Sequence, residues 1–486
     1  MVAHRQDQFE KIRIENLKKL RELGINPYPS KIDIKGDLVS LESALGMEGK
    51  EVLVAGRLWS VRTHGQIAFF DLKDDKTKLQ LFFQKDKLKK KFDLLKLFDQ
   101  GDFVAVVGKI GKTIAGEISL FVDDFQILSK SLRQIPSKWH GLKDIEERFR
   151  KRYLDLLLNP EIRERFNIRT ILVREVRRYL DNSGFWEVET PTLQSLYGGA
   201  NAKPFKTHLN ALDIDIYLRI ADELYLKRLL VGGYEKVYEI CKDFRNEGKD
   251  LTHNPEFTMI EYYEAYADYQ KVMDVTEGLF KHLAKSIFGE QSLKVGDKVI
   301  DISKKWPRIP MTKIIKEKIG LNVDKETEGS LEKYCRENKI ELVGGESKGQ
   351  LIFTIFDHKV TDYLTEPTWI IDYPKEVSPL SKDKPDSPGF VERFEGYIGG
   401  KEICDGWSEL TDPQEQRKRF VSDTKAARKD KEEAQHVDED FLEAMEYGMP
   451  PTGGIGIGID RLTMFFTNTW SIKEVMLFPT MRPISK

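Results

Sequence analysis

The chain has 486 residues, of which 40% are hydrophobic and 33% charged, and its formal net charge is −2. That length supplies two or three domains with a full core. The balanced charge excludes a uniformly basic protein, so any surface for nucleic acid must be local. No apolar run reaches the roughly 20 residues of a membrane span, and the N-terminus has no apolar signal-peptide core. The three cysteines form no CxxC pair, which argues against a disulfide frame and a thiolate zinc site and favours a reducing cytoplasm.

The first 50 residues are expected to form a helical extension, because apolar residues recur at helical spacing over residues 5–24. Lys and Arg lie between them, and GINPYPSK then ends the pattern. The helix could pack against a neighbouring domain. Alternatively, its basic side chains could serve as a handle for a polyanion.

Five strand-like runs separated by turn residues follow over residues 51–129, and a charged helical stretch precedes the fourth. This order predicts an OB-fold barrel, for which we assign residues 51–145. Phe69–Phe70 and Phe82–Phe83 are adjacent pairs, so one ring of each pair points into the barrel and one points out. The outer rings could stack nucleotide bases, or all four could fill the core.

Residues 146–486 read as one mixed domain of helices and strands, beginning with a helix over residues 161–182. The absence of a regular βαβ rhythm favours an antiparallel or mixed sheet flanked by helices. The predicted fold class is therefore α+β, with a β-barrel ahead of this domain. The polar run 422–437 is expected to be a solvated helix.

A hairpin is predicted from two alternating runs, residues 237–245 and 256–264, which are joined by a charged tip. Side chains with the same parity share one face: Glu239, Cys241, Asp243, Arg245, Phe257, Met259, Glu261 and Tyr263. Burying unpaired carboxylates costs several kcal/mol or forces them to be neutral. This acidic and aromatic face therefore indicates the floor of a polar pocket.

Residues 394–410 are interpreted as a second strand-like run, in which Asp405, Trp407 and Glu409 share a face. Glu395 and Glu402 are expected at an open strand end, where two carboxylates suit Mg²⁺ with substrate oxygens. The alternative is a surface ion pair with Lys401 or Arg393.

Glycines alternate in residues 451–466, which allows close approach of a backbone or a flat ligand. This pattern is not the GxGxxG of a dinucleotide loop.

With these stretches in hand, the chain resembles the class II aminoacyl-tRNA synthetases, and within them the lysyl-tRNA synthetases. The matching segments are GFWEVETP (184–191), FRNEG with HNPEF (244–257), GIGIGIDR (454–461), WHGLKDIEERFRKRYLDL (139–156) and NAKPF (201–205). The resemblance covers nearly the whole chain, and the class I motifs HIGH and KMSKS are absent. It implies activation of L-lysine with ATP, transfer to tRNA(Lys), and a homodimer built on residues 184–191.

The resemblance also implies roles at the nucleotide. Arg245 would bind the ATP α-phosphate and the amino-acid carboxylate, where charge develops during attack. Phe257 and Arg461 would stack on the two faces of adenine. The remaining nucleotide and metal positions are Glu247, His253 and Gly458 for ATP, and Glu395 and Glu402 for Mg²⁺.

For the amino acid, the resemblance places Glu223 at the α-amine and Glu409, Tyr263 and Glu261 at the side-chain ammonium. Trp407 replaces a smaller aromatic residue. Asp405 stands where the family usually has Asn, beside the substrate carboxylate. An Asp would repel that carboxylate unless it is protonated, turned away or bridged by a cation.

In the barrel, the resemblance implies that Arg62, Phe69, Gln80 and Glu117 read the anticodon, with Phe69 stacking on an unstacked base. Two other readings stay open. One is a ligase of the same fold that uses a lysine analogue or a protein acceptor. The other is a non-catalytic RNA-binding relative.

Overall fold

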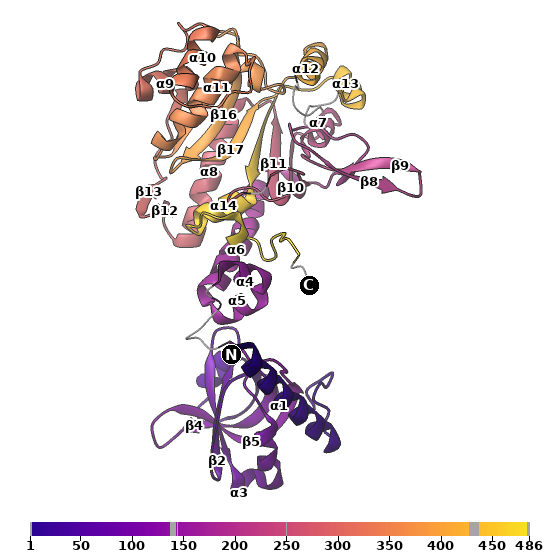
Figure 1. The fold of residues 1–486 in the computed structure, drawn as a ribbon, viewed down its shortest axis with the longest axis vertical. Coiled ribbons are helices and arrows are strands. Elements are labelled where there is room, and N and C mark those ends of the chain that lie inside the picture. Colours follow the sequence, from indigo (N-terminus) through magenta and orange to yellow (C-terminus); the bar gives the residue numbers. More distant parts are fainter. Residues whose placement is uncertain (1, 137–141, 143, 249, 427–436, 484–486) are drawn as a thin grey trace. The chain divides into compact units, whose positions relative to one another are not determined.

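The computed structural model describes residues 2–136, 142, 144–248, 250–426 and 437–483 (Figure 1). Parts of the 422–437 run and of the 139–156 motif lie outside these residues. The chain divides into two compact units, residues 1–143 and 144–486. Within the described residues, we find no helix that combines the length and the apolar character needed to span a bilayer.

The first unit contains the predicted OB-fold barrel, which closes in the strand order β1-β2-β3-β5-β4. Its strands are β1 (Glu51–His64), β2 (Ile67–Lys73), β3 (Lys78–Gln84), β4 (Phe103–Lys112) and β5 (Ile118–Ser129). Its helices are α1 (Val2–Glu22), α2 (Leu41–Leu45), α3 (Lys85–Leu88) and the 3-10 helix η1 (Lys89–Leu97). The helical stretch before the fourth strand is thus confirmed.

Helix α1 packs against the barrel. Leu20 is fully buried in the barrel core, and Arg13 donates a hydrogen bond of 2.8 Å to the carbonyl of Arg133. Of the apolar residues at helical spacing, Phe9, Ile12 and Leu23 are exposed, so the buried part of the stripe is Leu17 and Leu20. These contacts confirm the packing interpretation of residues 5–24.

The second unit is built on an eight-stranded sheet in the order β14-β15-β16-β17-β18-β11-β10-β6. Only the β14–β15 and β10–β6 pairs of this sheet are parallel, which confirms a mixed, mainly antiparallel sheet. Its strands are β6 (Trp186–Glu187), β10 (Lys236–Phe244), β11 (Glu256–Ala265), β14 (Arg308–Pro310), β15 (Thr368–Pro374), β16 (Phe390–Ile398), β17 (Lys401–Ser408) and β18 (Thr452–Gly458). Two smaller sheets comprise β7 (Leu193–Gln194), β8 (Phe205–Leu209) and β9 (Ile214–Leu218), and β12 (Ser292–Val295) with β13 (Lys298–Asp301).

Helices flank this sheet: α8 packs against β16, β17 and β18, and α7 packs against β10 and β11 (Figure 1). They are α4 (Ile145–Arg150), α5 (Arg152–Leu158), α6 (Pro160–Asn182), α7 (Glu223–Val231), α8 (Tyr269–Phe288), α9 (Met311–Ile319), α10 (Glu328–Glu337), α11 (Lys348–Lys359), α12 (Pro413–Ala426), α13 (Glu439–Glu446) and α14 (Ile459–Phe466). The 3-10 helices are η2 (Thr361–Tyr363), η3 (Lys375–Val377) and η4 (Ile472–Glu474).

The single run expected over residues 394–410 is wrong, because it is a hairpin of β16 and β17. Gly399 and Gly400 have φ of 62° and 74°, a left-handed conformation that glycine adopts without steric cost, and they form the turn. Glu395 consequently lies inside β16, opposite Asp405, and not at an open strand end.

Candidate active site

A cavity of about 380 Å³ opens over the central strands β11, β17 and β18. Most of the site residues predicted from the sequence line it, and they come from the β10–β11 hairpin, the β16–β17 hairpin, α7 and α14. The predicted residues that line it are Glu223, Arg245, Glu247, His253, Phe257, Glu261, Tyr263, Glu402, Asp405, Trp407, Gly458 and Arg461. Glu395 and Glu409 lie behind this lining.

The predicted nucleotide end of the cavity is formed by the tip of the β10–β11 hairpin and the start of α14. The guanidinium of Arg245 stands over the ring of Phe257, 5.1 Å from its centroid. From the first turn of α14, Arg461 places Nη2 3.1 Å from Nε2 of His253 and Nη1 3.4 Å from Oε2 of Glu402. Two cations and a ring therefore share one cavity, as the nucleotide assignment requires.

The alternating glycines lie in β18, between β11 and β17. A Cβ added at Gly454 would lie 2.3 Å from the ring of Tyr263, and one added at Gly456 would lie 3.1 Å from Met259. Any larger residue at Gly454 would clash with the Tyr263 ring. The glycines therefore allow close approach of side chains from the neighbouring strand.

Beside Glu223 on the cavity wall lies a buried ammonium group that the sequence patterns did not predict. Lys227 lies one turn after Glu223 on α7 and contacts both Glu223 and Oε2 of Glu409, the latter at 2.5 Å. Burial raises the pKa of Glu409 to about 8, while Lys227 partly offsets that rise. Burial alone would lower the pKa of Lys227, but the two carboxylates outweigh it and raise the pKa. The i, i+4 spacing from Glu223 was the available signal.

Hydrogen bonds orient the other predicted lysine-binding groups. The indole Nε1–H of Trp407 donates to Oε2 of Glu409 at 2.8 Å, and the hydroxyl of Tyr263 donates to Oε2 of Glu261 at 2.8 Å. Burial raises the pKa of Glu261 well above its usual range, and the charges of Asp222 and other neighbouring acids add to the effect. The predicted lysine-binding groups therefore form a buried acidic pocket.

Asp405 is bridged by a cation from the same chain. Arg393 donates through Nε and Nη2 to the two Asp405 oxygens, both at 2.9 Å, and through Nη2 to Oε1 of Glu395 at 2.7 Å. Tyr397 donates to the other oxygen of Glu395 at 2.6 Å. Burial raises the pKa of Glu395 to about 8, partly offset by Arg393. Of the three conditions for an Asp at this position, a cation beside the carboxylate is present, and burial also raises the pKa of Asp405.

The alternative given for Glu395, an ion pair with Arg393, is present, but the pair is buried and not on the surface. Glu402 differs, because its side chain is 40% exposed on the cavity wall. Of the two predicted magnesium ligands, Glu395 is therefore buried, whereas Glu402 is partly exposed to solvent.

On the barrel, three of the four predicted anticodon residues lie on β1, β2 and β3, and the fourth, Glu117, directly precedes β5. Phe69 is half-buried and stacks on Phe82 with ring centroids 4.9 Å apart, whereas Phe70 is buried. Gln80 donates to Oε2 of Glu117 at 2.8 Å. Arg62 lies opposite Phe69 in the β1–β2 register. The expected alternation of the two rings is confirmed.

The fold and the cavity together define a class II aminoacyl-tRNA synthetase with an OB-fold domain. Residues 144–482 match the family described as tRNA synthetases class II (D, K and N), and residues 52–128 match the OB-fold nucleic acid binding domain. The chain therefore belongs to this class II family.

Relatives match along nearly the full length of the chain. A lysine–tRNA ligase of Thermoanaerobacter pseudethanolicus is 46% identical, covering 98% of this chain and 96% of that protein. One from Bacillus subtilis is 44% identical, with coverages of 98% and 97%. Lysine–tRNA ligase 2 of Methanosarcina mazei is 47% identical, with coverages of 98% and 94%.

Proposed function

We propose that the protein is a lysine–tRNA ligase, which forms lysyl-adenylate and pyrophosphate from L-lysine and ATP and then transfers lysine to the 3′ end of tRNA(Lys). The observation that carries this proposal is the single cavity in which Arg245 and Arg461 lie at one end and the buried acids at the other. Adenylate formation needs a nucleotide and an amino acid side by side. The relatives named above support lysine as that amino acid.

In this proposal, Arg245 and Arg461 are the catalytic residues. Arg245 contacts the ATP α-phosphate and the lysine carboxylate, and its fixed charge stabilises the negative charge that develops as the two react. Phe257 and Arg461 hold adenine between them. Glu247, His253 and Gly458 complete the nucleotide site.

Glu395 and Glu402 suit Mg²⁺ in chemistry, because hard cations prefer carboxylate oxygens. Glu402 lies at the cavity wall, and each oxygen of Glu395 accepts one hydrogen bond and keeps a second lone pair. Bound there, the ion would draw charge from the triphosphate.

For L-lysine, Glu223 receives the α-amine, and Glu409, Glu261 and Tyr263 surround the side-chain ammonium. A buried acidic site of this kind favours substrates with that ammonium, because Lys227 alone offsets only part of the charge of Glu223, Glu261 and Glu409. The Arg393 bridge supports an ordinary L-lysine as substrate, since it offsets the charge of Asp405. Trp407 closes the pocket beside Glu409.

The barrel supplies tRNA recognition, with Phe69 stacking on an anticodon base while Arg62, Gln80 and Glu117 contact base edges. We further propose a cytoplasmic homodimer that pairs through residues 184–191. Trp186 in this segment is 68% exposed, which supports a surface that a second subunit covers.

The experiment is ATP–pyrophosphate exchange with each standard amino acid, β-lysine and ornithine, followed by aminoacylation of tRNA(Lys). We expect exchange with L-lysine and charging of the tRNA. Exchange with an analogue but not with L-lysine would overturn the substrate assignment. Binding of tRNA without ATP turnover would overturn the enzymatic one.

A further inference from the structure

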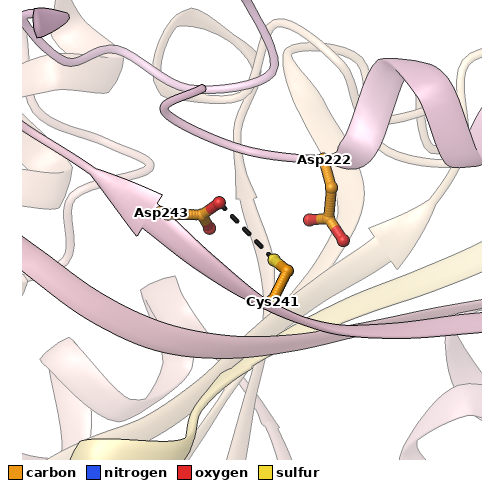
Figure 2. Close-up of side chains that lie close together, drawn as sticks. All are labelled: Asp222, Cys241 and Asp243. Carbon is orange, nitrogen blue, oxygen red and sulfur yellow. Dashed lines mark hydrogen bonds between the residues drawn. The ribbon is translucent and has the colours of Figure 1, made fainter. Parts of the chain in front are cut away.

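Three buried side chains meet beneath the floor of the lysine pocket: Asp222, Cys241 and Asp243. Asp222 directly precedes α7, whereas Cys241 and Asp243 are two residues apart on one face of β10. One ligand-type atom from each lies within 4.8 Å of the others (Figure 2). The Cys241 thiol donates a hydrogen bond of 3.5 Å to Oδ1 of Asp243. Two remote segments therefore converge on one small volume.

Asp222 lacks the partners that a buried carboxylate needs. It occupies the N-cap position of α7, where Asp usually accepts a backbone N–H, but its side chain makes no capping bond. It is fully buried and turns toward Cys241 (Figure 2). Among the described residues, no N–H or O–H group donates to either of its oxygens, nor to Oδ2 of Asp243. The neighbour that does contact Asp222 is another acid, Glu261, which can donate only when protonated.

The surrounding charges do not balance. Arg219 donates to Oε1 of Glu239 at 2.7 Å and lies 3.4 Å from Oδ1 of Asp243. The groups that interact here are four carboxylates and two guanidiniums: Asp222, Glu239, Asp243, Glu261, Arg219 and Arg245. If all four carboxylates and the Cys241 thiol are ionised, three negative charges remain, of which a divalent cation would offset two. Otherwise protons must do so.

We propose that Asp222, Cys241 and Asp243 form a zinc site beneath the lysine pocket. A thiolate with carboxylates suits Zn²⁺, whereas Mg²⁺ and Ca²⁺ prefer oxygen ligands alone. Zn–S and Zn–O bonds of about 2.3 and 2.0 Å at a tetrahedral angle put sulfur and oxygen about 3.5 Å apart. The distance between Cys241 and Asp243 matches that spacing. One coordination position remains for solvent.

The ion would act as a brace, because it joins the start of α7 to β10. Helix α7 carries Glu223 and Lys227, and β10 leads directly to Arg245, so the brace fixes both ends of the cavity relative to each other. The spacing of the cysteines argued against a thiolate zinc site, and the fold supplies a site with only one thiolate. This inference goes beyond the proposed function and does not depend on it.

The test is metal analysis of the full-length chain by inductively coupled plasma mass spectrometry after purification without chelators. We expect about one zinc ion per chain, and about a tenth of that or less in Asp222→Asn and Cys241→Ser. Cys335→Ser is the matched control, since Cys335 is also a buried thiol but lies on α10, and it should keep the zinc. Circular dichroism verifies that each variant is folded.

Cobalt substitution keeps the proposal testable if one variant fails to fold. Cobalt-loaded wild type should show a near-ultraviolet thiolate-to-cobalt band that Asp222→Asn weakens and Cys241→Ser abolishes. A wild-type chain with neither zinc nor this band overturns the site, as does zinc retained in both ligand variants. Wild type that binds zinc but stays fully active after a chelator removes it would refute the brace alone. A zinc-loaded chain without ligase activity would refute the proposed function alone.

Discussion

The barrel face and the cavity floor both combine charged and aromatic side chains, but they expose them to solvent very differently. On the barrel, the Arg62 side chain is 53% exposed, and its contact with Asp71 is 3.9 Å long. In the cavity, Lys227 and Glu409 are almost fully buried and in direct contact. Exposed ion pairs contribute little, whereas breaking a buried pair costs several kcal/mol. Substitutions at the cavity should therefore change both the free energy of unfolding and the rate of adenylate formation. Substitutions on the barrel face should change tRNA recognition alone.

The largest effect is expected from Arg245→Ala, which removes a charge that acts on the reacting groups. ATP–pyrophosphate exchange with L-lysine should fall by about a thousandfold or more. Lys242→Ala is the control, because Lys242 lies on β10, which ends directly before Arg245, but forms an exposed pair with Glu256. Near-normal exchange by Arg245→Ala would contradict the assigned chemistry.

Lys227→Met tests whether the buried ammonium holds the acids of the lysine pocket together. Leaving Glu223 and Glu409 unpaired should lower the free energy of unfolding by about 3–5 kcal/mol. Added L-lysine should raise the Tm of this variant more than that of wild type, because the substrate amines can replace the lost charge.

The control for that variant is Lys281→Met, which removes a half-buried ammonium that pairs with Glu277 on α8, away from the cavity. Its response to L-lysine should equal that of wild type. An equal ligand response in Lys227→Met would mean that the substrate does not contact these carboxylates.

Patterns with a local period made much of this structure predictable. The five strands of the barrel, the orientation of Phe69 and Phe70, and the acidic face of the β10–β11 hairpin all follow from local patterns along single strands. The same rule failed at Gly399 and Gly400, because the alternating pattern continues on both sides of the turn.

Contacts between distant segments could not be predicted in this way. Lys227 meets Glu409 only because α7 packs beside the end of β17, and Asp222 meets Cys241 only because α7 begins over β10. The fork between Arg393 and Asp405 depends on the β16–β17 register, which the expectation of one continuous run concealed. Such pairs are fixed by tertiary packing, which has no period in the sequence.

Phe69→Ala should weaken tRNA aminoacylation without changing adenylate formation. Loss of one base–aromatic stack costs about 1–3 kcal/mol, or roughly 5- to 150-fold in kcat/KM for aminoacylation. ATP–pyrophosphate exchange should be unchanged. Phe103→Ala, which removes another partly exposed ring from the barrel, should leave both activities near wild type. Loss of exchange in Phe69→Ala would show that the two sites are not independent.

The smallest effect is expected from Asp405→Asn, which removes a charge that Arg393 already offsets. With L-lysine, kcat/KM for exchange should stay within about fivefold of wild type, or about 1 kcal/mol. Asp386→Asn, in an exposed loop before β16, is the control. A much larger loss with L-lysine would mean that the charge of Asp405 itself contacts the substrate, as it would if an amine lay where the α-carboxylate is expected. In that case Asp405→Asn should also weaken exchange with β-lysine, so measuring both substrates distinguishes a neutralised Asp from one that selects the substrate.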